Sequence, residues 1–150
     1  MKRIILLFVL MVAAAAGSQA QTFTKKWNDF HKRTEYFDSQ GRLQGWSKWN
    51  DFHDRLEYFD RQGKMVKYEK HNSFHNRMET KDRNGKTLST RSYNDFHGRE
   101  DIKDSKGKVI GYKKWNDFHK RLEVFDSRGR LQGYYKWNDF HNRMEYHQKK

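Results

Sequence analysis

The sequence predicts an all-β protein: an elongated antiparallel meander, in a single-layer or open sheet, of six 22-residue β-hairpin repeats. Three observations carry this prediction. One motif recurs six times at constant spacing. Each copy contains two short segments in which polar and apolar residues alternate, as in half-buried strands. Turn-forming residues lie between these segments.

The recurring motif is an aromatic residue or histidine followed by Asn-Asp-Phe-His, with Ser in place of Asp in the third copy. The copies begin at Trp27, Trp49, His71, Tyr93, Trp115 and Trp137, and no insertion or deletion interrupts the spacing. Every copy keeps the phenylalanine, at Phe30, Phe52, Phe74, Phe96, Phe118 and Phe140. Every copy also keeps the histidine, at His31, His53, His75, His97, His119 and His141. A fixed period of this kind indicates an array in which each unit packs mainly on its neighbours.

The fifth copy shows how one unit divides into two strands and two turns. Residues 121–126 form the first strand, and Asp126-Ser-Arg-Gly129 suits a type I turn whose glycine takes a positive φ. Residues 130–137 form the second strand and residues 138–142 the second turn. We therefore expect strands near 33–38 and 42–49 and at their 22-residue translations.

Period-two alternation assigns the side chains of each hairpin to two faces. A tight pairing across the Asp-x-x-Gly turn places Val124 opposite Leu131 and Leu122 opposite Gly133. This apolar face, which also collects Tyr135, is expected to be the better buried one. The other face is basic, with an aromatic column and a lysine column: Trp46, Tyr68, Tyr112 and Tyr134, with Lys48, Lys70, Lys114 and Lys136.

The two ends of the array and its centre depart from the repeat. The chain after residue 20 starts with a second strand and ends with a first strand, so only five Asp-x-x-Gly turns accompany the six motif turns. In the third and fourth copies, Lys81 and Lys103 replace an aromatic residue and Glu100 replaces an apolar one. This polar centre is expected to be a bend, a looser segment or a distinct contact site.

The first 20 residues have the organisation of an export signal. Lys2 and Arg3 precede an apolar run over 4–16, and Ser18-Gln-Ala20 is a small-x-small cleavage site. The apolar run is too short for a membrane span, which needs about 20 residues. We expect residues 1–20 to be removed, leaving one repeat domain over 21–150. The protein is then exported to the periplasm or the outside of a bacterial cell, with no transmembrane segment.

Composition favours an acidic partner. The whole chain has a formal net charge of +13, which falls to +11 without residues 1–20. Such a charge favours polyanions such as anionic polysaccharide, lipid headgroups or nucleic acid. Nucleic acid is disfavoured by the expected export. The chain contains no cysteine, so neither disulfides nor thiol chemistry is available.

Two strings carry a resemblance to known repeats: Glu35-Tyr-Phe-Asp-Ser-Gln-Gly-Arg-Leu-Gln-Gly-Trp46 and Glu123-Val-Phe-Asp-Ser-Arg-Gly-Arg-Leu-Gln-Gly-Tyr134. They resemble YD repeats and MORN-like repeats and, more weakly, the choline-binding and glucan-binding cell-wall repeats. The resemblance implies a β-hairpin array. The cell-wall repeats bind ligands between aromatic rings of adjacent hairpins, which implies Trp46, Tyr68, Tyr112 and Tyr134 as contacts. The period of 22 and the Asn-Asp-Phe-His turn depart from that family.

The sequence favours neither a metal centre nor an enzyme. Equivalent histidines of a meander are about 9–10 Å apart, two strand spacings, whereas two ligands of one zinc ion must approach within about 4 Å. We therefore expect the histidines to be structural, the motif phenylalanines to tuck each turn under the next hairpin, and no cofactor. Every candidate acid or base occurs in several equivalent copies, which does not suit a single catalytic pocket.

The leading functional hypothesis is a non-catalytic module that binds cell-envelope or host glycans and other polyanions through the basic-aromatic face. Its candidate ligand contacts are the aromatic and lysine columns given above. The alternative is a structural or assembly protein of the envelope, acting through strand edges or its apolar face in self-association or with a protein partner.

Overall fold

The computed structural model describes residues 22–149 as twelve antiparallel strands joined by hairpin turns, with no helix in this range. The predicted export signal, residues 1–20, lies outside the described residues. The strands are β1 (Thr22–Asn28), β2 (Arg33–Phe37), β3 (Leu43–Asn50), β4 (Arg55–Asp60), β5 (Met65–Asn72), β6 (Arg77–Asp82), β7 (Thr87–Asn94), β8 (Arg99–Asp104), β9 (Val109–Asn116), β10 (Arg121–Asp126), β11 (Leu131–Asn138) and β12 (Arg143–Gln148). The predicted all-β hairpin meander is confirmed.

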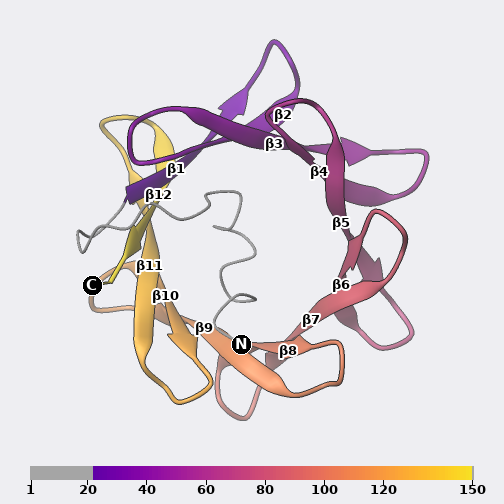
Figure 1. The fold of residues 1–150 in the computed structure, drawn as a ribbon. Coiled ribbons are helices and arrows are strands. Elements are labelled where there is room, and N and C mark those ends of the chain that lie inside the picture. Colours follow the sequence, from indigo (N-terminus) through magenta and orange to yellow (C-terminus); the bar gives the residue numbers. More distant parts are fainter. Residues whose placement is uncertain (1–21, 150) are drawn as a thin grey trace.

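The meander closes on itself, so the expected open sheet is wrong. Each strand pairs with its neighbours in sequence, and β1 also pairs with β12, which gives a ring of strands around a central lumen (Figure 1). Adjacent strands rotate relative to one another in a constant sense, and this rotation accumulates along a long meander until its ends can meet. Closure removes both free edges from the sheet.

The half-repeats at the two chain ends explain how the ring closes. Strand β12 corresponds to the first strand of a repeat and β1 to the second, so together they form the pair that an Asp-x-x-Gly turn joins elsewhere. Phe23 faces Tyr146 at the place where Gly133 faces Val124 in the fifth copy. The two ends therefore complete one more hairpin without a covalent turn.

The Asp-x-x-Gly turns are held by their aspartate. In the fifth copy, Asp126 Oδ1 accepts hydrogen bonds from the backbone N–H of Arg128 at 2.9 Å and of Arg130 at 3.0 Å. Gly129 has a φ of 77°, a left-handed conformation that glycine adopts at no steric cost. The same aspartate contacts recur in the four other turns, at Asp38, Asp60, Asp82 and Asp104.

The Asn-Asp-Phe-His turns are held by their asparagine. In the last of these turns, Asn138 Oδ1 accepts a hydrogen bond from the backbone N–H of His141 at 3.0 Å. The next residue, Asn142, has a φ of 49°, and the equivalent places in the other copies also have a positive φ. The asparagine contact recurs in every copy, at Asn28, Asn50, Asn72, Asn94 and Asn116. Neither the phenylalanine ring nor the histidine ring takes part in this hydrogen bond.

The predicted faces are largely right, but the predicted register is not. Val124 lies opposite Gly133, not Leu131, and Leu122 lies opposite Tyr135. The cause is a bulge after Val124, which pairs Leu131 with Phe125 on the outer face. The expected apolar face is the inner face of the barrel, where the small core of Phe23, Val124 and Tyr146 packs.

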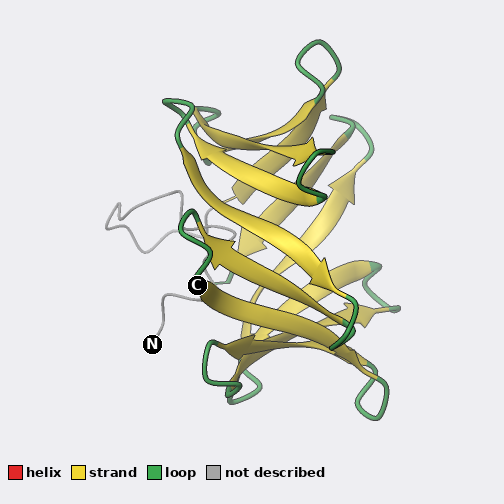
Figure 2. Cartoon of the chain, turned by 90° about the vertical axis from the view of Figure 1, so that its right-hand side faces the viewer, coloured by secondary structure: helices red, strands yellow, loops and turns green. Residues whose placement is uncertain are grey.

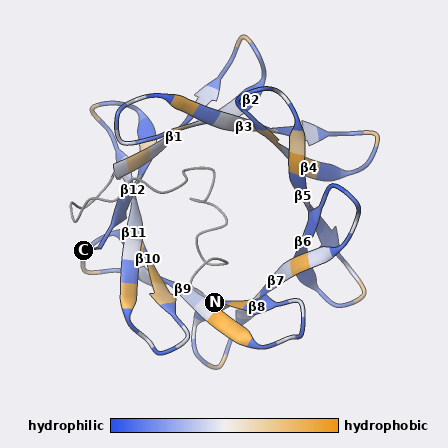
Figure 3. Ribbon diagram, in the orientation of Figure 1, coloured by the Kyte–Doolittle hydropathy of each residue, from blue (hydrophilic) through white to orange (hydrophobic). Residues whose placement is uncertain are grey.

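The turns lie at the two ends of the barrel. A meander that closes into a ring places successive turns alternately at opposite ends, and Figure 2 shows the loops gathered in this way. We call the end with the six Asn-Asp-Phe-His turns the rim. Figure 3 shows hydrophobic tips on the hairpins that project outward from the ring.

Candidate binding surfaces: the outer face, the rim and the lumen

The predicted aromatic column lies on the outer face of the barrel, and its rings are half-buried by the protein's own side chains. The guanidinium carbon of Arg33 lies 4.1 Å from the ring centroid of Trp46. Three more arginines cover the other rings at 4.0–4.2 Å, Arg55 over Tyr68, Arg99 over Tyr112 and Arg121 over Tyr134. Cross-strand rings stack on three of these residues: Phe59 on Trp46, Phe125 on Tyr112 and His147 on Tyr134.

The covering arginines are fixed by carboxylates on the same strand. In β10, Arg121 Nη2 lies 2.6 Å from Glu123 Oε1, which also accepts a hydrogen bond from Asn116 Nδ2 at 3.1 Å. Burial works to raise the pKa of Glu123, but the hydrogen bonds from Arg121 and Asn116 outweigh it and hold this pKa below its usual range. The aromatic column is thus part of a ladder of arginine, carboxylate and asparagine that braces the outer wall, and an arginine covers one face of each of its four rings.

The predicted lysine column is exposed and lies close to the rim. Lys48, Lys70, Lys114 and Lys136 are all exposed, and each comes two residues before the asparagine that begins a rim turn. Lys70 Nζ donates a hydrogen bond to the carbonyl of His53 in the neighbouring rim turn, at 3.2 Å. These lysines therefore add positive charge to the rim, whereas the rings of the aromatic column belong to the outer wall.

The motif phenylalanines are exposed, so the expected tucking of each ring under the next hairpin is wrong. Their exposed fractions are 89–92 % at Phe30, Phe52, Phe74, Phe96, Phe118 and Phe140. The rim hairpins project away from one another, so no neighbour covers a turn (Figure 3). Each ring touches the edge of its own histidine, at centroid distances of 4.8–4.9 Å at His31, His53, His75, His97, His119 and His141.

A second set of aromatic rings lies at the base of the rim hairpins. Trp27, Trp49, Trp115 and Trp137 are 47–53 % exposed. Trp27 Nε1 donates a hydrogen bond to Asp29 Oδ1 at 2.8 Å, and Trp115 to Asp117 at 3.0 Å. Each copy thus forms a rim unit, defined as the motif Trp, Tyr or His, the Asp or Ser, the Phe-His pair and, in all but the fourth copy, the lysine before the motif.

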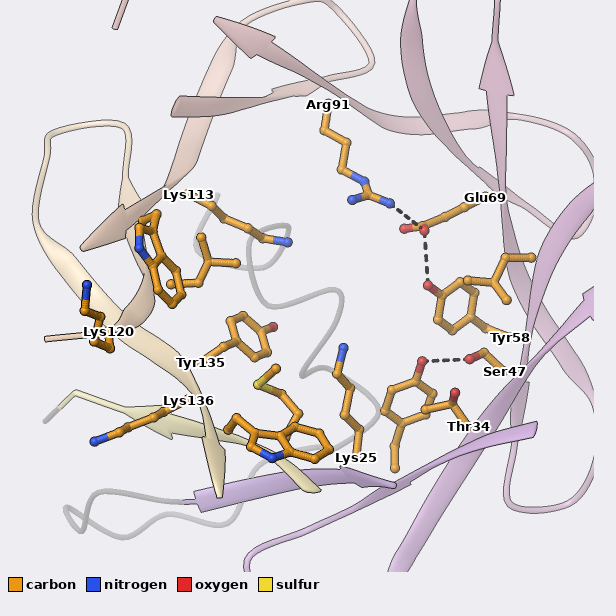
Figure 4. A pocket seen from close by; sticks show the side chains of 16 residues that line it. Lys25, Thr34, Ser47, Tyr58, Glu69, Arg91, Lys113, Lys120, Tyr135 and Lys136 are labelled. Atoms are coloured by element: carbon orange, nitrogen blue, oxygen red, sulfur yellow. Dashed lines mark hydrogen bonds and ion pairs between the residues drawn. The ribbon is translucent and has the colours of Figure 1, made fainter. Parts of the chain in front are cut away.

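The lumen contains a cavity of about 550 Å³ that sequence reasoning missed (Figure 4). Side chains from every strand except β6 and β8 line it, and among them are Lys25, Tyr58, Glu69, Arg91 and Lys113. Lys136 borders the cavity too, but its side chain points away from the cavity (Figure 4). The sequence did contain a signal for this cavity. Lys25, Glu69, Arg91 and Lys113 occupy equivalent positions of the repeat, and the residue at this position differs from copy to copy.

Within residues 22–149, no group of three or more histidine, cysteine, aspartate or glutamate side chains is placed to hold a metal ion. The motif histidines lie on separate rim hairpins, each beside its own phenylalanine. The same part of the chain has no helix with the length and apolar character that a membrane crossing requires.

Comparison with known proteins shows the fold alone. No family model matches the chain, and no curated protein matches it. A protein of Arabidopsis thaliana, solved by X-ray crystallography, is similar in structure with a TM-score of 0.63 and 14 % sequence identity. The match covers 86 % of this chain and 80 % of that one. The chain is thus a β-hairpin repeat barrel, and its resemblance to YD, MORN-like and choline-binding or glucan-binding repeats stays a resemblance.

Proposed function

We propose that the protein is an exported, non-catalytic module that binds glycans of the cell envelope or of a host, anionic polysaccharides foremost, through its rim. One observation carries this proposal: six phenylalanines repeat without exception and yet are about nine-tenths exposed. Burial does not explain their retention, because no core contact depends on them. A surface that repeats six times suits a ligand that is itself a repeating polymer.

The chemistry of a rim unit fits an acidic sugar chain. Apolar ring faces, here a half-exposed Trp and an exposed Phe, pack against the C–H face of a sugar ring. The aspartate at the tip can accept hydrogen bonds from sugar hydroxyls, and the nearby lysine can pair with a carboxylate or sulfate. Contacts that are weak one by one add up when a long chain engages several units.

The rim units differ from a catalytic site. A catalytic acid or base works from a site that holds the substrate and shifts the pKa of that group. The rim units are open and nearly equivalent, which suits repeated binding. The candidate contacts are therefore the motif aromatics together with Lys48, Lys70, Lys114 and Lys136, while Trp46, Tyr68, Tyr112 and Tyr134 support the wall behind them.

The assembly alternative has less geometric support. It needs unpaired strand edges or an exposed apolar sheet face. In the described barrel, β1 and β12 pair with each other, and the apolar sheet face is turned inward. Association would have to use the rim itself. Export to the periplasm or the cell exterior remains part of the proposal, on the evidence of residues 1–20.

Replacing Phe96, Phe118 and Phe140 together by serine is expected to weaken binding to an anionic polysaccharide such as alginate or heparin at least tenfold. The melting temperature should stay within about 2 °C, because exposed side chains contribute little to stability. Binding on a glycan and polyanion array and thermal unfolding measure the two effects. A large drop in melting temperature would mean that the phenylalanine rings pack against other side chains of the protein. Unchanged binding would remove the rim aromatics from the site.

Charge at the rim can be tested with a matched pair of variants. Lys114→Gln with Lys136→Gln removes two positive charges near the rim, whereas Lys106→Gln with Arg128→Gln removes two exposed charges at the opposite end of the barrel. Only the first variant should bind the same polysaccharides more weakly. The difference should shrink at 1 M salt, where the screening length falls to about 3 Å. Equal losses in both variants would indicate attraction by net charge and no rim site.

A further inference from the structure

The barrel is nearly six-fold repetitive on its outer face and rim but singular inside. One central residue of every strand lies on the inner face, at a spacing of 11 in the sequence. Across each rim hairpin two of these residues are direct partners, and across the other strand pairs they are offset by two residues. These residues are Lys25, Tyr36, Ser47, Tyr58, Glu69, Thr80, Arg91, Ile102, Lys113, Val124, Tyr135 and Tyr146. These twelve residues vary, although the repeats are otherwise alike. The requirements of the repeated fold alone therefore do not account for them.

Cations from three well-separated strands converge on the cavity. Lys25 on β1, Arg91 on β7 and Lys113 on β9 all direct their charged groups into it (Figure 4). Arg91 Nη2 lies 2.8 Å from Glu69 Oε2, and Arg91 Nη1 lies 3.4 Å from Glu100 Oε1. Lys113 Nζ lies 3.9 Å from Glu100 Oε2.

Among residues 22–149, several charged side chains gather at this part of the inner face. Lys67, one layer nearer the Asp-x-x-Gly end, joins Lys25, Arg91 and Lys113, so four cations and two carboxylates, Glu69 and Glu100, lie here. Burial lowers the pKa of Lys25, and the charge of Arg91 lowers it further. Burial is also the main cause that lowers the pKa of Lys113. An anionic group in this space would be attracted by these cations.

The rest of the lining offers rings and hydroxyls. Tyr36 Oη and Ser47 Oγ lie 2.7 Å apart, and Tyr58 Oη donates a hydrogen bond to Glu69 Oε2 at 3.1 Å. Tyr135 lines the same space between Lys25 and Lys113 (Figure 4). A volume of about 550 Å³ is typical of pockets for small organic molecules. These features suit a ligand with an anionic group and a ring or apolar body.

We propose that the lumen binds a small organic anion, a carboxylate or a phosphate ester, with its charged group among Lys25, Arg91 and Lys113 and its body against the tyrosines. Trp115 and Trp137 line the cavity and are about half exposed, so the cavity opens toward the rim. A ligand can enter by that route without breaking a strand pair. The proposal does not depend on glycan binding at the rim.

The test compares three probes that share a benzene ring: phenyl phosphate, benzoate and benzyl alcohol. Titration calorimetry of the purified protein at pH 7 is expected to show one-to-one binding of at least one anion, at least tenfold tighter than the alcohol. The tighter of the two anions identifies the preferred charged group. Binding of benzyl alcohol as tightly as both anions, or no binding of any probe at millimolar concentration, would overturn the proposal.

Two variants locate the site. Lys113→Gln and, separately, Lys25→Gln are each expected to weaken binding of the preferred anion at least tenfold, while Lys106→Gln, in an exposed turn, should leave it unchanged. Circular dichroism checks that each variant keeps its fold, and glutamine has as many side-chain heavy atoms as lysine. Equal affinities for Lys113→Gln, Lys25→Gln and Lys106→Gln would place the anion outside the lumen.

Discussion

A disulfide between β1 and β12 is expected to stabilise the barrel by about 4–5 kcal/mol, the chain-entropy value for a loop of more than 100 residues. Thr22 and His147 lie directly opposite each other, and their side chains already approach to 3.3 Å. The chain has no cysteine of its own, so Thr22→Cys with His147→Cys offers one pairing only. Denaturant unfolding of the oxidised and reduced protein measures the gain.

This disulfide separates a closed barrel from an open sheet. In an open meander, eleven spacings of about 4.8 Å would hold β1 and β12 roughly 50 Å apart, and the bond could not form within one chain. Thr22→Cys with Gln148→Cys is the control, because Gln148 lies one residue out of register with Thr22. Closure would be contradicted if Thr22→Cys with His147→Cys oxidised slowly or formed its disulfide between two molecules. Oxidation that is equally easy in the control variant would contradict it too.

Replacing Lys67 by methionine is expected to stabilise the protein by about 3 kcal/mol. Burial is the main cause that lowers the pKa of Lys67 from 10.5 to about 8, and the charges of Arg91 and Lys113 add to it, while Glu69 works in the opposite direction. Each unit of such a shift corresponds to about 1.4 kcal/mol. The loss of the contact between Lys67 Nζ and the ring of Tyr58, at 4.7 Å, offsets part of the gain. Lys106→Met is the exposed control.

The sign of the pH dependence follows from the same shift. Between pH 8 and about 10, the unfolded chain holds a proton on Lys67 that the folded chain has lost, so the free energy of unfolding rises with pH. Below pH 8 both states are protonated and the full cost remains. Above pH 10 the trend reverses, because burial raises the pKa of Tyr36 and of Tyr146 to about 12. Urea unfolding at pH 7 and 9.5 should show a smaller rise in Lys67→Met; an equal rise would contradict the assignment to Lys67.

The local architecture could be predicted from sequence, because each strand and turn is encoded within its own repeat. The strands expected near 33–38 and 42–49 are found at 33–37 and 43–50, and the turn residues act as predicted. Closure could not be predicted in the same way. It depends on rotation summed over twelve strands, and no single repeat contains that sum. The half-repeats at the chain ends were the available clue.

The candidate sites were harder to predict, because repetition shows that a residue is retained and does not show why. Phe118 was expected inside since it never varies, yet the asparagine contact alone forms the turn and leaves the ring in solvent. Trp46 was expected to be an open ring, but Arg33, on the neighbouring strand of the same hairpin, covers it. The lumen was missed because its charged residues break the repeat, and only a closed ring brings Lys25 close to Arg91 and Lys113.

The pairing of β1 with β12 also sets the order in which the structure can form. Eleven of the twelve strand pairs join consecutive strands, so their contacts are local and hairpins of this kind form within about 1–10 μs. The remaining pair joins Thr22 to His147, at opposite ends of the domain. The conformational entropy of the long loop between them is lost only in the final step of folding, when β1 and β12 pair. Folding is therefore expected to be fast and sequential until the last strand is available. The lumen therefore forms only once β12 is available to pair with β1.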